Sequence, residues 1–212
     1  MKRILLPLIC LLVIGSCKKD EINNVLIPPK TYPTRYPGAY LPTYPGSYWV
    51  YNTGDTVKTG AKYVTAEIYR EYRNFGTGAV TCNAIETAIF PVYRGAYVKD
   101  YTLYGLNSKG VCYNNPLLSE ELGKMITLYA SKYYRTELIV KSKDVQITLP
   151  NGKVYDSVIV MNELNYGGPE LDVEHYYAKH IGFIGKQTIE NYFTQDTVPV
   201  WDKYLVDYYI NY

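Results

Sequence analysis

Histidine and cysteine are the residue types most often used for catalysis and metal binding, and this chain of 212 residues has few of either. Its two histidines, His175 and His180, would lie on opposite faces of an unbroken strand because their separation is odd. The chain has no Cys-x-x-Cys or His-x-x-x-His spacing typical of zinc sites, and no nucleophile-elbow, phosphate-loop or dinucleotide-binding pattern. The sequence therefore predicts no catalytic residue, no metal site and no cofactor.

Tyrosine is the residue type that does suggest a function, because the chain has 26 tyrosines against four phenylalanines and two tryptophans. An exposed tyrosine can stack on a sugar ring or dock a partner protein at a low cost in conformational entropy. The alternative is that tyrosine is abundant because its side chain suits half-buried strands. The candidate binding residues are three pairs close in sequence: Tyr63 and Tyr69, Tyr133 and Tyr134, and Tyr176 and Tyr177.

The start of the chain has the pattern of a secretory signal peptide. Lys2 and Arg3 form a basic start, and residues 4–14 form an apolar run about half as long as a membrane-spanning helix. The run ends in Val-Ile-Gly-Ser-Cys, which resembles the lipobox of bacterial lipoproteins. The resemblance implies that residues 1–16 are a lipoprotein signal peptide that is removed, and that Cys17 carries the lipid. An ordinary signal peptide is the alternative.

The residues after Cys17 bear on localisation. Residues 18–21 read Lys-Lys-Asp-Glu, which looks like the start of many Bacteroidetes lipoproteins displayed at the outer-membrane surface. We therefore expect a lipid-anchored outer-membrane protein, on the cell surface or on the periplasmic leaflet. Removal of the signal peptide takes Lys2 and Arg3 from the 22 basic residues, so that 20 basic and 20 acidic residues remain. A neutral domain has no electrostatic reason to bind nucleic acid.

Export also bears on Cys82 and Cys112, the two cysteines of the expected mature domain. Outside the cytoplasm, an even number of cysteines suggests a disulfide bond. A bond between these two would close a loop of about 30 residues and stabilise the fold by about 3–4 kcal/mol in the chain-entropy description. Two buried free thiols are the alternative.

A tether is expected between the lipid anchor and the folded domain. Residues 22–46 hold six of the 12 prolines, and each proline fixes φ and removes a backbone donor. Such a segment favours polyproline II and acts as a semi-rigid spacer. Tyr-Pro-Gly-x-Tyr occurs twice, at 36–40 and 44–48, which is too few copies for a repeat architecture. The expected organisation is signal peptide 1–16, Pro/Tyr-rich tether 17–46 and β domain 47–212.

Most of the remaining chain has the two-residue apolar–polar alternation of half-buried strands. Asn151-Gly152 indicates a two-residue type I′ hairpin, although a longer loop or a bulge would pair Ile147 better. The one helix candidate is a short turn at 116–123. We predict an all-β fold with a strongly curved antiparallel sheet, half-barrel or barrel-like, and at most one short helix. Strands are expected at 48–51, 62–70, 79–93, 96–106, 125–130, 133–140, on both sides of 151–152, and at 174–184, 186–193 and 201–210.

The C-terminal part of the chain resembles one group of bacterial lipoproteins. Residues 156–160 read Asp-Ser-Val-Ile-Val, and residues 176–185 read Tyr-Tyr-Ala-Lys-His-Ile-Gly-Phe-Ile-Gly. Similar strands occur in uncharacterised lipoproteins of the Bacteroidetes type, where a glycine takes the place of His180. The resemblance covers residues 145–210 and the Tyr-Trp-Val-Tyr start at 48–51. It implies a curved antiparallel sheet and no catalytic residue.

These observations lead to three functional hypotheses. The first is a non-enzymatic, membrane-anchored binding or scaffold domain at the cell envelope, with a glycan or an envelope protein as partner. It predicts a cluster of exposed aromatic side chains. The second is a carrier for a lipid or lipoprotein, which predicts an apolar cavity inside the curved sheet. The third is an envelope hydrolase, which predicts a converging acid–base pair in a cleft.

Overall fold

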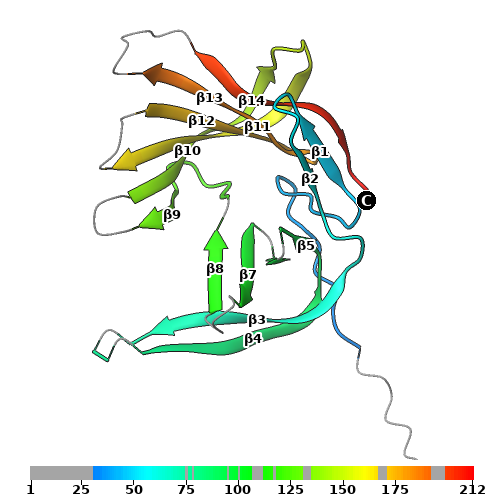
Figure 1. Ribbon diagram of the computed structural model, residues 1–212, viewed down its shortest axis with the longest axis vertical. Coiled ribbons are helices and arrows are strands. Elements are labelled where there is room, and N and C mark those ends of the chain that lie inside the picture. The colour runs from blue at the N-terminus through cyan, green and yellow to red at the C-terminus, as the bar shows by residue number, and fades with distance from the viewer. Residues whose placement is uncertain are drawn as a thin grey trace, which may run out of the picture. The chain divides into compact units, whose positions relative to one another are not determined.

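The structure is a computed structural model in which residues from Tyr32 to Tyr212 form one compact unit. All regular structure in the described residues is β-strand, which confirms the all-β prediction (Figure 1). The expected helical turn at 116–123 was wrong within its described part, where residues 121–123 form a turn that ends at Gly123 with φ +72°. The described residues are 31–74, 76–77, 79–94, 96–99, 101–106, 112–116, 118–130, 135–166, 171–191 and 199–212.

The strands follow one another with short connections. In chain order they are β1 (Tyr48–Tyr51), β2 (Thr56–Lys58), β3 (Val64–Arg73), β4 (Val80–Phe90), β5 (Val92–Tyr93), β6 (Ala96–Lys99), β7 (Thr102–Leu106), β8 (Cys112–Pro116), β9 (Met125–Ala130), β10 (Arg135–Thr148), β11 (Val154–Tyr166), β12 (Leu171–Ala178), β13 (Gly182–Asn191) and β14 (Val200–Tyr209).

Eight strands form the largest sheet, in the order β2-β1-β14-β13-β12-β11-β10-β9. Every neighbouring pair in it is antiparallel. Shifts of register interrupt five of the seven pairs. Because a β-bulge bends its strand and increases the local twist, such a sheet is expected to curve.

Contacts between strands that are distant in the sheet establish the curvature. In a flat sheet β14 and β11 would lie about 14 Å apart, because three strand spacings separate them. The turn before β11 nevertheless reaches β14: the Asn151 side-chain amide donates to the carbonyl oxygen of Leu205 at 3.0 Å. The Lys153 ammonium likewise donates to the carbonyl oxygen of Val206 at 2.5 Å. The sheet therefore curls, in agreement with the predicted half-barrel, and its edge strands β2 and β9 are not paired with each other.

Both faces of this sheet are covered by apolar side chains at β11. Val158 and Val160 belong to a buried cluster that also holds Trp49 from β1 and Leu205 from β14, so this cluster fills the concave face. Ile159 and Met161, which alternate with these two valines along the strand, belong to a second cluster on the other face. A strand that is covered on both sides reads as a continuous apolar run, as residues 158–161 at the centre of β11 do.

Two smaller sheets complete the unit. Strands β3 and β4 form a long two-stranded hairpin, and β5 to β8 form a meander. The hairpin buries Ile68, Ala88 and Phe90 on one face. A single parallel bridge between Thr34 and Ile89 attaches the segment before β1 to the edge of β4.

The second half of the expected tether belongs to the folded unit. Tyr40, Leu41 and Thr43 are buried, with relative exposures of 3%, 6% and 0%. Tyr40 packs with Leu138 and Met161, and thereby covers the outer face of the sheet. The expected boundary at 46/47 is therefore too late, because this proline-rich segment is extended but lies on the sheet rather than in solvent.

The hairpin between β10 and β11 also differs from the expected two-residue turn. Leu149 and Lys153 close a three-residue loop through a 2.9 Å backbone hydrogen bond, and the Gly152 N–H donates to the Leu149 carbonyl oxygen at 2.9 Å. Only Gly152 of the Asn-Gly pair has a positive φ, at +80°. The cause is Pro150, whose fixed φ suits the second position of a type I turn. The longer loop pairs Ile147 with Tyr155.

The strand expected at 174–184 is two strands joined by a tight turn. The Ile181 N–H donates to the Ala178 carbonyl oxygen at 3.1 Å, and β12 ends at Ala178 while β13 begins at Gly182. His180 and Gly182 have φ values of +63° and +96°. Two left-handed residues so close together reverse the chain, and alternation of side chains alone does not reveal them.

Candidate functional site

A groove lined mainly by tyrosine side chains is the candidate binding site. It is open to solvent and has a volume of about 430 Å³. Its residues come from three parts of the chain: the segment before β1, the loop between β2 and β3, and the residues after β14. They are Tyr36, Tyr44, Pro45, Ala61, Lys62, Tyr63, Asn211 and Tyr212. We call this site the tyrosine groove.

The rings in the tyrosine groove meet in two pairs. Tyr36 and Tyr63 are edge to face, with ring centroids 6.4 Å apart and an interplanar angle of 77°. Tyr44 and Tyr212 are tilted by 57°, with centroids 5.2 Å apart. Two aromatic rings in an offset or edge-to-face pair attract each other, and this attraction favours fixed ring orientations. The groove therefore presents preformed aromatic surfaces to a ligand.

Hydrogen bonds hold the residues after β14 against the segment before β1. The Asn211 side-chain amide donates to the Pro45 carbonyl oxygen at 2.8 Å, and its backbone N–H donates to Ser47 Oγ at 3.0 Å. The Tyr212 hydroxyl donates to the carbonyl oxygen of His180 at 2.7 Å. These bonds fix one wall of the groove to the turn between β12 and β13.

The opposite wall is fixed through the loop that follows β2. The Thr59 hydroxyl donates to the Tyr44 carbonyl oxygen at 2.7 Å, and the Gly46 N–H donates to the Gly60 carbonyl oxygen at 2.9 Å. Gly46 has φ +84°, a left-handed conformation that glycine adopts without strain. The Pro-Gly pair thus turns the chain so that Tyr44 faces the groove.

The groove combines apolar rings with polar atoms. Burial raises the pKa of Tyr63 above its usual value, and the nearby Tyr44 and Tyr36 raise it further. Burial likewise raises the pKa of Tyr212, so both phenols are neutral at physiological pH. Within the described residues, the hydroxyls of Tyr36, Tyr44 and Tyr63 make no hydrogen bond. Lys62 supplies a positive charge to the groove.

The structure separates the tyrosine pairs that the sequence suggested. Tyr63 lies in the tyrosine groove, whereas Tyr69 lies on β3 and its hydroxyl donates to Glu67 Oε2 at 2.7 Å. Tyr176 is buried and packs against Trp201 with ring centroids 5.0 Å apart and the rings tilted by 36°, so it is a core residue.

The other suggested tyrosines do not form a described binding surface. Tyr177 points to the opposite face of β12 from its neighbour and packs on Phe183, with ring centroids 5.4 Å apart. It also lies against the buried cluster on the outer face of the sheet. Tyr133 and Tyr134 lie outside the described residues.

Of the three cysteines that the sequence singled out, the structure describes the side chain of one, Cys82. Cys82 is disulfide-bonded. The side chain of Cys112, on β8, is outside the described part of the chain, so the pairing of Cys82 with Cys112 stays a prediction. Cys17 also lies outside the described residues, and its lipidation stays a prediction.

The sequence did not predict three of the groove tyrosines, Tyr36, Tyr44 and Tyr212. The first two lie in the segment that was expected to be a spacer. Tyr36 and Tyr44 are the first residues of the two Tyr-Pro-Gly-x-Tyr copies. The last residue of the first copy, Tyr40, is buried, and that of the second, Tyr48, stacks on Tyr209 with centroids 6.0 Å apart. The repeated motif was therefore the available signal. The chain pattern held no comparable signal for Tyr212.

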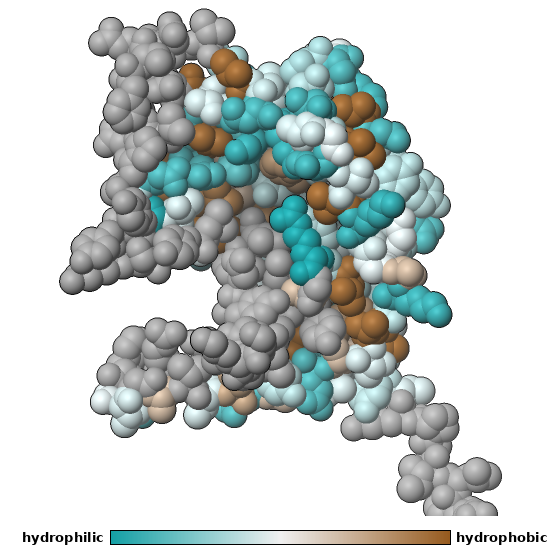
Figure 2. Space-filling view, in the orientation of Figure 1, coloured by the Kyte–Doolittle hydropathy of each residue, from teal (hydrophilic) through white to brown (hydrophobic). Residues whose placement is uncertain are grey.

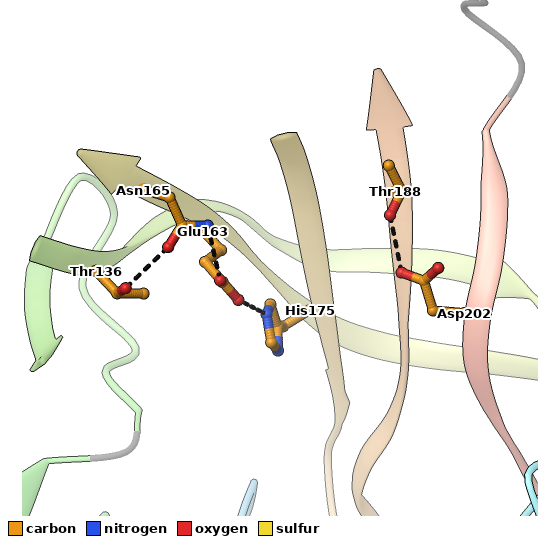
Figure 3. Close-up of polar contacts among 6 residues, drawn as sticks. All are labelled: Thr136, Glu163, Asn165, His175, Thr188 and Asp202. Atoms are coloured by element: carbon orange, nitrogen blue, oxygen red, sulfur yellow. Dashed lines mark hydrogen bonds and ion pairs between the residues drawn. The ribbon is translucent and has the colours of Figure 1, made fainter. Parts of the chain in front are cut away.

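Apart from the tyrosine groove, a cluster of hydrogen-bonded polar side chains joins strands β10, β11 and β12 (Figure 3). The His175 ring donates from Nε2 to Glu163 Oε2 at 2.7 Å, and the Asn165 amide donates to Glu163 Oε1 at 2.9 Å. The Thr136 hydroxyl donates to Asn165 Oδ1 at 2.8 Å. His180 lies apart from this cluster, in the turn after β12. The arrangement joins neighbouring strands and, among the described side chains, supplies no nucleophile to His175.

The cluster predicts a pH dependence of stability. The hydrogen bond from His175 holds the pKa of Glu163 below its ordinary value, against the effect of burial, with Asn165 as a further donor. A carboxylate with a lowered pKa stabilises the fold above its unfolded-state pKa of about 4.3 and loses that contribution as the pH falls through the lowered value. Glu163→Gln is expected to cost about 1 kcal/mol of unfolding free energy at neutral pH and progressively less below about pH 4.

Urea unfolding of the wild type and of Glu163→Gln at several pH values measures this difference. Glu121→Gln is the matched control, because Glu121 is exposed and its Lys124 partner is 3.9 Å away. A wild-type advantage that stays constant from neutral pH to below pH 4 would contradict the proposed role of the His175 hydrogen bond.

The described surface shows few other candidate sites. Hydrophobic residues on the face in Figure 2 form separate patches among hydrophilic ones. No group of three or more His, Cys, Asp or Glu side chains that could hold a metal occurs in the described residues. The same residues include no helix with the length and apolar character needed to cross a bilayer.

Comparison with protein-family models, with curated proteins and with solved structures finds no match for this chain.

Proposed function

We propose that this protein is a lipid-anchored, non-enzymatic binding protein of the bacterial outer membrane, and that its tyrosine groove binds a glycan. The observation that carries the proposal is the clustering of Tyr36, Tyr44, Tyr63 and Tyr212 around one open groove. Tyrosines scattered singly over strand faces would have favoured a purely structural role. The anchor rests on the lipobox-like residues that end at Cys17.

A glycan suits the groove better than a protein surface because of the mixture of groups in it. Sugar rings have apolar C–H faces that stack on aromatic rings and hydroxyl edges that need hydrogen-bond partners. The groove offers ring faces together with the phenol hydroxyls of Tyr36, Tyr44 and Tyr63, which are unengaged within the described residues. Binding to an envelope protein instead of a glycan is an outcome that the experiment below distinguishes.

The carrier hypothesis has less support. The concave face of the curved sheet holds a buried cluster that includes Tyr155, Val158, Ile184 and Leu205. A carrier would use this face as an apolar cavity for acyl chains, whereas these side chains pack on one another. The hydrolase hypothesis has less support as well, because the His175–Glu163 pair joins strands rather than facing a described nucleophile.

Replacing Tyr36 tests the groove. The side chain is 66% exposed, so Tyr36→Ala is expected to leave the melting temperature unchanged. Loss of one stacking ring is expected to weaken glycan binding by about tenfold, which corresponds to about 1.4 kcal/mol. Calorimetric titration with oligosaccharides selected on a glycan array, applied to wild type and variant, measures the change.

Tyr72→Ala is the matched control, because Tyr72 is a 47% exposed tyrosine on β3 that does not line the groove. It is expected to bind like the wild type. Two results would overturn the proposal: equal losses in both variants, or no binding of any array glycan by the wild type. Retention of an envelope protein that requires Tyr36, with no glycan bound, would replace the glycan by a protein partner.

A further inference from the structure

We infer that the tyrosine groove selects acidic saccharides, with the Lys62 ammonium pairing with a sugar carboxylate while the tyrosine rings stack on the sugar. This inference rests on the proposed function, because it names the class of glycan that the same groove would take.

The first observation is the charge of the lining. Lys62 is the one residue with a charged side chain among the eight that line the groove, and no aspartate or glutamate lines it. Lys62 is exposed and makes no ion pair within the described residues. Its ammonium is therefore available to a ligand without first breaking a protein ion pair.

The second observation is the position of the charge relative to the rings. Lys62 directly precedes Tyr63, whose ring meets that of Tyr36 edge to face. Both Lys62 and Tyr63 line the same groove, so one saccharide can contact an aromatic ring and the positive charge together.

The third observation concerns the other polar groups. The phenols of Tyr63 and Tyr212 stay neutral at physiological pH, since burial raises both pKa values. The Tyr63 phenol can donate a hydrogen bond to a carboxylate or hydroxyl oxygen, whereas the Tyr212 phenol already donates to the His180 carbonyl oxygen. Neither phenol adds a negative charge that would oppose an acidic ligand. The Asn211 side chain also lines the groove and is held by its bond to Pro45.

The expected size of the effect is modest, because an exposed ion pair contributes at most about 1 kcal/mol, which corresponds to about fivefold in affinity. Such a contribution falls at high ionic strength because salt screens exposed charges. Stacking supplies most of the affinity, and Lys62 supplies the preference among sugars.

The test uses pairs of saccharides that differ only in charge. Oligogalacturonate, oligoglucuronate and oligomannuronate are each titrated beside their methyl-esterified, neutral forms, at low and at high salt, into the full mature protein. The wild type is expected to prefer at least one acidic member over its ester by about fivefold at low salt, and by less at high salt.

Three variants complete the test. Lys62→Gln is expected to bind the acid and its ester equally, and Lys62→Arg is expected to keep the preference. Lys58→Gln removes an exposed lysine of β2 that does not line the groove, and it is expected to behave like the wild type. Far-ultraviolet circular dichroism confirms that each variant is folded.

The outcomes separate the two claims. Equal binding of acids and esters by the wild type, or binding of neutral array glycans alone, overturns the selectivity while the glycan-binding function stands. A preference that survives in Lys62→Gln also overturns the role of Lys62. Failure to bind any acidic or neutral glycan overturns the proposed function itself.

Discussion

Replacement of Cys17 by serine is expected to move the protein from the membrane fraction to the soluble fraction. Lipidation of a lipobox needs a thiol to form the thioether, and a hydroxyl does not replace it. Each buried CH₂ of an acyl chain contributes about 0.8 kcal/mol to membrane binding, so loss of all chains removes essentially the whole anchor. Residues 17–212 hold 20 basic and 20 acidic residues and therefore have little attraction to an anionic bilayer.

Membrane fractionation of the exporting cells measures this effect, and mass spectrometry of the mature protein measures the lipid and the new N-terminus. Cys10→Ser is the matched control, because Cys10 lies in the apolar run that is expected to be removed. This control is expected to fractionate with the membrane, like the wild type. A wild-type mature chain that keeps residues 1–16, or one that carries no lipid on Cys17, would refute the lipoprotein assignment.

The largest expected effect on folding is that of Trp49→Ala. Trp49 is 4% exposed within the cluster on the concave face of the sheet. Its indole Nε1 donates to the Ile181 carbonyl oxygen at 2.5 Å, and its ring meets Tyr93 edge to face at 6.3 Å. Truncation leaves a cavity and an unpaired carbonyl, so a loss of about 3–5 kcal/mol is expected. That is a large fraction of the stability of a typical domain.

Equilibrium unfolding in urea measures the loss, and Trp49→Phe keeps the measurement informative when the alanine variant does not fold. The phenyl ring fills most of the site but lacks the indole N–H, so Trp49→Phe is expected to cost about 1–2 kcal/mol. An alanine variant within about 1 kcal/mol of the wild type would show that Trp49 does not hold the concave core together.

Most strands could be predicted because their side chains alternate with a clear period. Strand β1 is an example: Trp49 and Tyr51 are buried and alternate with the partly buried Tyr48 and Val50. The failures arose where conformation depends on contacts between distant residues. The proline-rich segment around Tyr40 is extended whether it is free or packed, and only Leu138 and Met161, far along the chain, decide that it is buried.

The groove was less predictable than the fold. The sequence suggested pairs of tyrosines that are adjacent in the chain, such as Tyr176 and Tyr177, yet adjacent residues on a strand point to opposite faces. The tyrosines that do meet come from distant segments, as Tyr44 and Tyr212 show. Only Tyr63 was named in advance, because no local pattern encodes the pairing of the segment before β1 with the residues after β14.

The place of β1 within the large sheet has a consequence for translocation. Strand β1 lies between β2 and β14, and the bond between Ser47 and Asn211 joins residues 164 positions apart. A polypeptide that crosses a membrane with its N-terminus first delivers β1 long before β14. Pairing over such a separation is slow, because the intervening chain must close first. A chain exported in this direction would therefore lack the pairing of β1 with β14 until β14 had reached the far side.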